Sequence, residues 1–427
     1  MKQAFSAGVS SPPFPRTPLH WVRILMSVVV CGWQCLPLAA QEADTTQAVR
    51  STFSISSAYF VNDYANNMDY VQFDLDLITA SSRLSLYGYE KFSDHINGKF
   101  SRIAYYLGAH VLMESTGIFL SYHEWGHASR TVAMGGTARM SNCYSENEWC
   151  SAPRNFLGYT GSQFFHSDGG GQVLSSGQLS GNSESGRAYL SILHGAGVNN
   201  AMLIAEKQGE QHFLRGHASV FGQLIMGDQF SIANYGPPNT GDLAGVAYNY
   251  RSTGVDTQIQ EHDLRAINNK SLLSGQTVNA IMATYDFVVD GKVYAKPLTY
   301  GGFWVPNQYN YITSRGITRK WVSGYEWNDS TKLLGSYEYV VRGDSFHEPG
   351  IGIYKNFGDW DALVKVSGKS VKWANLETAF SKRINKNWKY FATAYVWDSR
   401  SLLGERNSLK LKDNKTSQAS VGVAYEY

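Results

Sequence analysis

The pattern of apolar and polar residues predicts β-strands near the start of the chain. In residues 71–77, VQFDLDL, every second side chain is apolar, so a strand there would have one apolar face. Residues 51–61 and 82–92 alternate in the same way over shorter runs. We therefore expect three strands before residue 93.

The alternation returns in the last third of the chain. Residues 388–396 and 419–427 each place one set of side chains on one face, and residues 350–357 and 360–366 follow a similar pattern. Strands of about nine residues can cross a thin outer membrane when they are tilted. Small or polar side chains on one face and aromatic ones on the other suit a lumen and a lipid surface. The aromatic last strand resembles the closing strand of bacterial outer-membrane proteins.

The middle of the chain has a different pattern, which predicts helices. Residues 102–134 are mostly apolar and free of proline, and Gly135-Gly136 would end that helix. Helical patterns also run through residues 185–208 and 258–287. The Gly/Ser-rich residues 168–186 predict a loop between the first two of these helices.

The composition supports a membrane protein built mainly of strands. Charged residues make up 17% of the chain and aromatic residues 14%, whereas a soluble enzyme usually carries more charge. The formal net charge of +2 gives no electrostatic footprint for nucleic acid. We therefore expect a mainly β fold with inserted α-helices, namely a transmembrane β-barrel over residues 41–427 with a helical insertion at about 100–290. A soluble, secreted β-sandwich is the alternative.

Residues 1–40 predict a signal peptide for export. Basic residues precede the apolar stretch 24–38, and small residues mark a cleavage point after Ala40. An N-terminal membrane anchor is the alternative. Cys143 and Cys150 would remain after cleavage, and a single pair at this spacing predicts a disulfide in an oxidising compartment, with a zinc pair as the alternative. These features favour the bacterial outer membrane as the location.

The strongest chemical signal is the HExxH motif in residues 121–130, SYHEWGHASR. On a helix, His123 and His127 are about 40° apart, so both imidazoles can face one zinc ion. Glu124 lies about 100° round from His123, where its carboxylate can hold a water molecule and act as general base. The helical insertion is therefore expected to bind zinc through His123 and His127.

The motif segment resembles the active helix of zinc metallopeptidases of the zincin type. Residues 117–136, GIFLSYHEWGHASRTVAMGG, are especially similar to the membrane-embedded site-2-protease group, and residues 194–203, HGAGVNNAML, are similar to a later Gly- and Asn-containing helix of that group. The resemblance implies zinc-dependent hydrolysis of a peptide bond. In the site-2 group the third ligand is an aspartate from an LDGG-like segment, and this sequence has no such segment.

A catalytic zinc needs a third protein ligand, and His194 is the first candidate. It is a single imidazole in an apolar helical segment, followed by Gly195 and Gly197, and small residues there would let this helix approach the motif helix. A hydrogen-bonded core histidine is the alternative for His194. Further candidates for the ligand, in order, are Glu206, His262 and Asp168.

Together these features predict a zinc-dependent hydrolase of the bacterial outer membrane. We expect a metallopeptidase in which His123, His127 and His194 bind zinc and Glu124 is the catalytic base. Its partners would be membrane lipid and a peptide or protein substrate, with no nucleic acid; a lipid amide also fits the chemistry. The alternatives are a non-catalytic barrel for transport or adhesion with a structural metal site, and a soluble periplasmic metallopeptidase.

Overall fold

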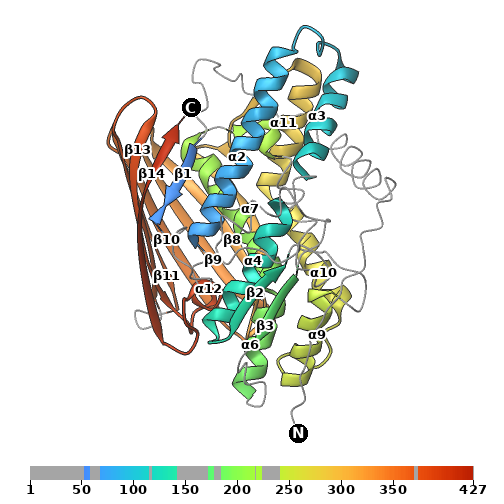
Figure 1. Cartoon of the computed structure of the whole chain (residues 1–427), viewed down its shortest axis with the longest axis vertical. Helices are drawn as coiled ribbons and strands as arrows, with labels where there is room; N and C mark the ends of the chain where they lie inside the picture. The colour runs from blue at the N-terminus through green and yellow to red at the C-terminus, as the bar shows by residue number, and fades with distance from the viewer. Residues whose placement is uncertain are drawn as a thin grey trace.

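A large antiparallel sheet with helices packed against one face makes up the computed structural model of this protein (Figure 1). The structure describes residues 52–57, 68–114, 118–141, 172–176, 184–216, 218–223, 241–369 and 374–426. The fold is therefore a mixture of strands and helices. None of the described helices is long and apolar enough to cross a membrane.

The sheet has ten strands in the order β1-β14-β13-β12-β11-β10-β9-β8-β7-β6. They are β1 (Thr52–Ser56), β6 (Thr299–Tyr300), β7 (Phe303–Thr313), β8 (Gly316–Asn328), β9 (Thr331–Gly343), β10 (His347–Asn356), β11 (Trp360–Gly368), β12 (Ala374–Arg383), β13 (Trp388–Asp398) and β14 (Lys415–Glu426). The strands expected in the last third of the chain are confirmed as β10, β11, β13 and β14. Among the described residues β1 and β6 are the two edges and do not pair, so the sheet is not closed into a barrel.

The helical segments whose bounds the structure describes lie on one side of the sheet or beyond its ends (Figure 1). They are α2 (Met68–Lys91), α3 (Lys99–Glu114), α4 (Ile118–Ala133), α6 (Glu184–His194), α7 (Ala196–Arg215), α9 (Asp242–Thr253), α10 (Glu261–Asn269), η3 (Lys270–Leu272), α11 (Gly275–Asp290) and α12 (Leu402–Asn407). Two small antiparallel pairs accompany them, β2 (Thr137–Ser141) with β3 (Gln172–Ser176) and β4 (Ala218–Ser219) with β5 (Tyr294–Ala295).

The expectation of strands at residues 71–77 and 82–92 is wrong, because both segments belong to helix α2. The same residues also fit a helical period: Val71, Leu75 and Ile78 are three or four apart and all enter the main core. Neither glycine nor proline interrupts residues 68–87. The strand expected within residues 51–61 is confirmed as β1, where the Ser54 backbone N–H donates to Asp76 of α2 at 2.8 Å.

The other expected helices are present with different limits. The segment 102–134 overlaps α3 and α4, and the segment 258–287 overlaps α10, η3 and α11. The segment 185–208 is divided into α6 and α7 at Gly195, where a Cβ would lie 2.5 Å from Ile312 Cγ2 of β7. The stretch expected to be a loop contains the short strand β3. The expected signal peptide and the expected Cys143–Cys150 disulfide lie outside the described residues.

Helix α7 crosses the inner face of the sheet and joins it to the other helices. Its buried residues Ala201 to Ala205 belong to the main core with Trp304, Tyr309 and Tyr311 of β7. Its second half is tied to the sheet by buried charges, because Lys320 of β8 lies 2.7 Å from Glu206. The core therefore lies between α7 and the sheet.

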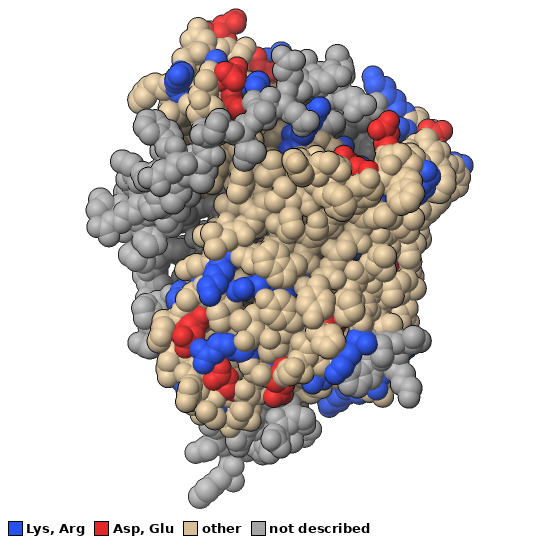
Figure 2. All heavy atoms as spheres, turned by 180° about the vertical axis from the view of Figure 1, so that it is seen from behind, with Lys and Arg blue, Asp and Glu red and all other residues tan. Residues whose placement is uncertain are grey.

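The sheet is charged inside and apolar outside. In β11, Lys365 points inward to Glu377 at 2.9 Å and Glu210 at 3.1 Å, whereas its neighbours Val364 and Val366 are 40% and 43% exposed. The same outer face also exposes Trp321, Tyr337, Ile351, Ile353, Leu376, Phe380, Tyr390 and Val421. Figure 2 shows a broad field without charged side chains on the back of the molecule, bordered by charges above and below.

Candidate metal centre

Helix α4 presents both motif imidazoles on one face because His123 and His127 are four residues apart. The helix ends where the sequence predicts. Gly135 has a φ of 84°, in the left-handed region, and the Gly136 N–H donates to the Thr131 carbonyl at 3.0 Å. Against the far side of α4, Trp125 packs edge-on against Tyr70 of α2 with ring centroids 4.4 Å apart. The motif is therefore on a regular, firmly packed helix.

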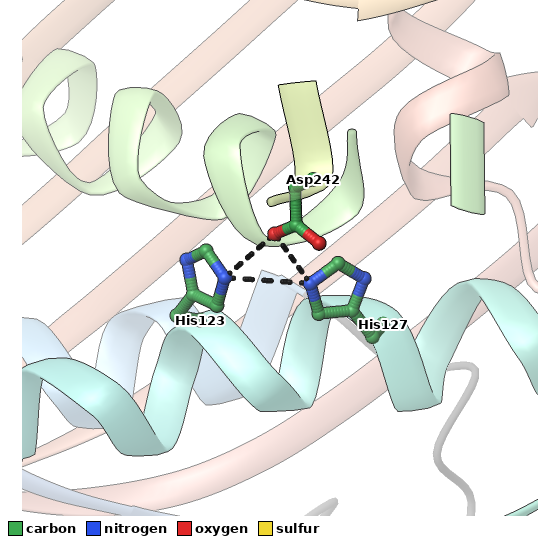
Figure 3. A group of neighbouring side chains, drawn as sticks. All are labelled: His123, His127 and Asp242. Atoms are coloured by element: carbon green, nitrogen blue, oxygen red, sulfur yellow. Dashed lines mark hydrogen bonds and ion pairs between the residues drawn. The ribbon is translucent and has the colours of Figure 1, made fainter. Parts of the chain in front are cut away.

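The third group at this centre is the carboxylate of Asp242 (Figure 3). Its Oδ2 lies 2.9 Å from His123 Nε2 and 3.0 Å from His127 Nε2, and the two Nε2 atoms are 3.4 Å apart. Asp242 is the first residue of α9, where a negative side chain is stabilised by the helix dipole. Its side chain is 23% exposed, so the centre is not sealed from solvent.

The triangle formed by these three atoms has the right size for zinc. The point equidistant from all three lies about 1.8 Å from each, from the distances between them. All three atoms could therefore bond one zinc ion at the usual distance of about 2.0–2.1 Å. Three protein ligands with the remaining position open are the arrangement of catalytic rather than structural zinc sites.

Hydrogen bonding prepares His127 for a metal. Its Nδ1 donates to the Leu193 carbonyl at 2.7 Å, which leaves Nε2 as the ligand atom of the neutral ring. Without an ion, both ring nitrogens face oxygen acceptors. Although burial disfavours the charged ring, the charge and hydrogen bond of Asp242 raise the pKa of His127 to about 9. The charges of the two histidines in turn hold the pKa of Asp242 below its usual range despite burial.

Glu124 is buried beside the two imidazoles on the same helix, with 8% of its surface exposed. Burial raises the pKa of its carboxyl, and the neighbouring His127 and His123 charges oppose that rise. A carboxyl whose pKa is moved toward neutrality is suited to accept and return a proton at working pH.

Comparisons with known protein families, curated proteins and solved structures found no match.

The first turn of α7 holds the motif helix and the sheet together. A Cβ at Gly197 would lie 2.6 Å from His123 Cδ2, and a Cβ at Gly126 would lie 2.5 Å from the Ala196 carbonyl oxygen. The close approach expected from the small residues after His194 is therefore confirmed. The segment HGAGVNN brings α7 into direct contact with the His123 ring.

The two asparagines of this segment form hydrogen bonds in opposite directions, one to helix α4 and the other to strand β7. Asn200 Nδ2 donates to the Tyr122 carbonyl of α4 at 2.8 Å. Asn199 pairs with Ile312 of β7 twice, donating to its carbonyl at 2.8 Å and accepting from its N–H at 2.7 Å. Replacing either side chain would remove buried hydrogen bonds that position the metal helix.

His194 lies outside the group formed by His123, His127 and Asp242. Its imidazole packs against α9 one turn beyond Asp242, since a Cβ at Gly245 would lie 2.6 Å from His194 Nδ1. Burial lowers the pKa of His194, and the Asp242 charge opposes that change. The structure thus brings Asp242, rather than His194, to the two motif imidazoles.

The remaining ligand candidates lie elsewhere or outside the described residues. Glu206 is buried in the ion pair with Lys320 and accepts from the Tyr311 hydroxyl at 2.5 Å. The side chain of His262 is 79% exposed on α10. Asp168 lies outside the described part of the chain. Neither Glu206 nor His262 belongs to the metal centre.

The signal for Asp242 was present in the sequence but was overlooked. After Gly241, the residues Leu243, Val246, Ala247 and Tyr250 follow the spacing of a helix, and all four are buried. An aspartate directly before such a pattern marks the start of a helix. Its pairing with α4, 115 residues earlier, is a tertiary contact that no local pattern indicates.

Proposed function

We propose that this protein is a zinc-dependent hydrolase, of the metallopeptidase class, with zinc held by His123, His127 and Asp242. The observation that carries the proposal is the convergence of Asp242 from a distant helix on the two imidazoles of an HExxH motif. An aspartate is also the third ligand implied by the resemblance to the site-2-protease group. The side chains of Asp242 and His127 are 23% and 13% exposed, so solvent reaches the centre.

The residues of the site divide the chemistry of peptide hydrolysis among them. A zinc ion held there supplies a Lewis acid that lowers the pKa of water and polarises a carbonyl group. Glu124 accepts a proton from the water whose oxygen attacks the carbonyl carbon. When the C–N bond breaks, Glu124 returns that proton to the leaving nitrogen. The hydrogen bond from His127 to Leu193 keeps its ring oriented throughout.

We also propose that the sheet is the wall of a transmembrane β-barrel in the bacterial outer membrane. Supporting this are the apolar outer face and the charged inner face, since a barrel wall alternates apolar-out and polar-in. A soluble protein rarely exposes so large an apolar surface. The proposal adds closure between the β1 and β6 edges to the sheet as described. In this arrangement the helices fill the lumen, where they need no lipid-compatible surface.

The enzymatic part is tested by measuring zinc content and hydrolysis of a quenched fluorescent peptide library. Glu124→Gln should keep one zinc per chain and lose about 10²–10⁴-fold in rate, the usual contribution of a general base. Asp242→Ala should lose the metal. Glu90→Gln, an exposed position on α2, is the matched control and should change neither quantity.

Three outcomes would count against the proposal. Purified protein without stoichiometric metal removes the centre itself. A Glu124→Gln variant that retains full activity removes the proposed base. Zinc that remains bound with no hydrolysis of peptides or lipid amides by the unaltered protein indicates a structural metal site.

A further inference from the structure

We infer that the end of the sheet next to the metal centre faces the outside of the cell, so that the enzyme acts on a substrate supplied from outside. This inference rests on the proposed membrane location and concerns the direction in which the barrel wall is inserted. The direction follows from the connections between strands and from the position of the metal centre along the sheet, and the exposed aromatic residues mark a boundary of the bilayer.

The two ends of the sheet differ in the length of their connections. At the end where β8 meets β9, the turns are short, namely 329–330, 357–359 and 384–387. We call this the aromatic end. At the opposite end, which we call the metal end, three connections are also short, namely 314–315, 344–346 and 369–373, but the fourth, between β13 and β14, spans residues 399–414 and includes α12. Bacterial barrels have short turns on the periplasmic side and longer loops outside. The aromatic end therefore corresponds to the periplasmic side.

Exposed aromatic side chains gather at the aromatic end, where they would meet lipid head groups. They are Trp327, Phe357, Trp360, Phe380, Trp388 and Tyr425. Trp360 has the Lys382 amine 4.4 Å from its ring centroid, and Phe357 has that of Lys355 at 5.9 Å. Amphipathic aromatic rings and lysines are typical of a membrane interface. This end of the apolar field thus has the composition of a bilayer boundary.

The metal centre lies toward the other end. Helix α7 begins at the last residues of β7, where Asn199 binds Ile312, and α9 is held there by the Tyr250 hydroxyl, which donates to the Thr313 carbonyl at 2.8 Å. In Figure 1, α6, α9 and α12 lie at the end of the sheet away from the C-terminus. A centre at this end, with its open side toward solvent, receives substrate from the compartment that the longer connection faces.

The experiment is cysteine labelling of intact bacteria that produce the full chain. Asp344→Cys lies in the β9–β10 turn at the metal end, and Asp329→Cys lies in the β8–β9 turn at the aromatic end; both positions are exposed. With a membrane-impermeant maleimide, Asp344→Cys should label in intact cells at least tenfold more than the unaltered chain. Asp329→Cys should label only after the outer membrane is permeabilised.

A second pair, Ser345→Cys and Asn385→Cys, guards against a misfolded variant and should behave in the same way. Labelling of the aromatic end alone would overturn the inferred direction. Equal labelling of both ends in intact cells, or of neither, would overturn it too, because a wall inserted in one direction exposes only one end. The label does not depend on turnover, so repeating the experiment in Glu124→Gln protein separates this inference from the proposed hydrolase.

Discussion

Replacing Gly197 with alanine should weaken zinc binding, because the new methyl group would occupy the space of the His123 ring. A Cβ at position 197 would lie 2.6 Å from His123 Cδ2, whereas ordinary contacts begin near 3.4 Å. The ring must therefore move by at least about 0.8 Å, since its Cε1 and Nε2 atoms are closer still. Metal sites keep their ligand distances to about 0.2 Å. We expect at least the 10- to 100-fold loss of zinc affinity that follows from disturbing residues behind a ligand.

The stability of the zinc-free fold should change much less. Overpacking costs about 1–3 kcal/mol, and alanine recovers up to about 1 kcal/mol over glycine inside a helix. The assays are competition with a chromophoric zinc chelator, for affinity, and urea unfolding of chelator-treated protein, for stability. The prediction is supported if Gly197→Ala loses more zinc-binding free energy than it loses in the free energy of unfolding of the zinc-free protein.

Gly108→Ala is the matched control for this experiment. Gly108 is also a helical glycine, on the exposed side of α3, and a Cβ there would meet nothing within 4 Å. The variant should leave zinc affinity unchanged and stabilise the helix slightly. If Gly197→Ala binds zinc as tightly as the unaltered protein, or if both variants lose affinity equally, the contact between α7 and the His123 ring does not hold the ligand.

Three further predictions concern charge and lipid. In zinc-free protein, the pKa of His127 is raised from 6.5 to about 9. The stability that protonated His127 contributes is therefore complete below about pH 6.5 and lost as the pH rises through about 9. Melting curves across this window should show that loss, and the His127→Gln variant should lack this pH dependence. Val366→Arg on the outer face should cost about 2–4 kcal/mol for folding into lipid vesicles, whereas a surface in water would tolerate it. Lys320→Met should destabilise the protein by about 3–5 kcal/mol in urea, because it leaves Glu206 buried without its cation, and adding Glu206→Gln should restore most of the loss.

The strands of the last third were predictable because their environment repeats every two residues. In β13 and β14, alternate side chains face the helices or point away from them, and nothing in the sequence competes with that period. Residues 71–77 contain both periods at once, with Val71 and Leu75 fitting either a strand face or a helix face. In the fold, residues 71–77 are helical because α2 packs between β1 and the other helices. Local alternation alone could not settle this segment.

Only the part of the metal centre that lies on a single helix could be predicted from the sequence. His123, Glu124 and His127 share one local segment, and their spacing identifies them. The third group depends on where α9 lies in space, and His194 and Asp242 both come from helices packed near α4. The apolar setting of His194 made it the first candidate, but Asp242, at the first turn of α9, is the residue that reaches the two imidazoles. The choice between them is a property of the tertiary arrangement.

Helix α7 connects the proposed zinc centre to a sheet whose inner face is charged and whose outer face is apolar. Its first turn contacts the His123 ring through Gly197, and its second half meets the inward lysines of the sheet through Glu206 and Glu210. Inward charges would be costly in an empty apolar core, and outward valines would be costly in water. With α7 in place, the charges are paired. In the proposed membrane location, lipid would cover the outer face, and α7 would fix the proposed metal ligands relative to the membrane.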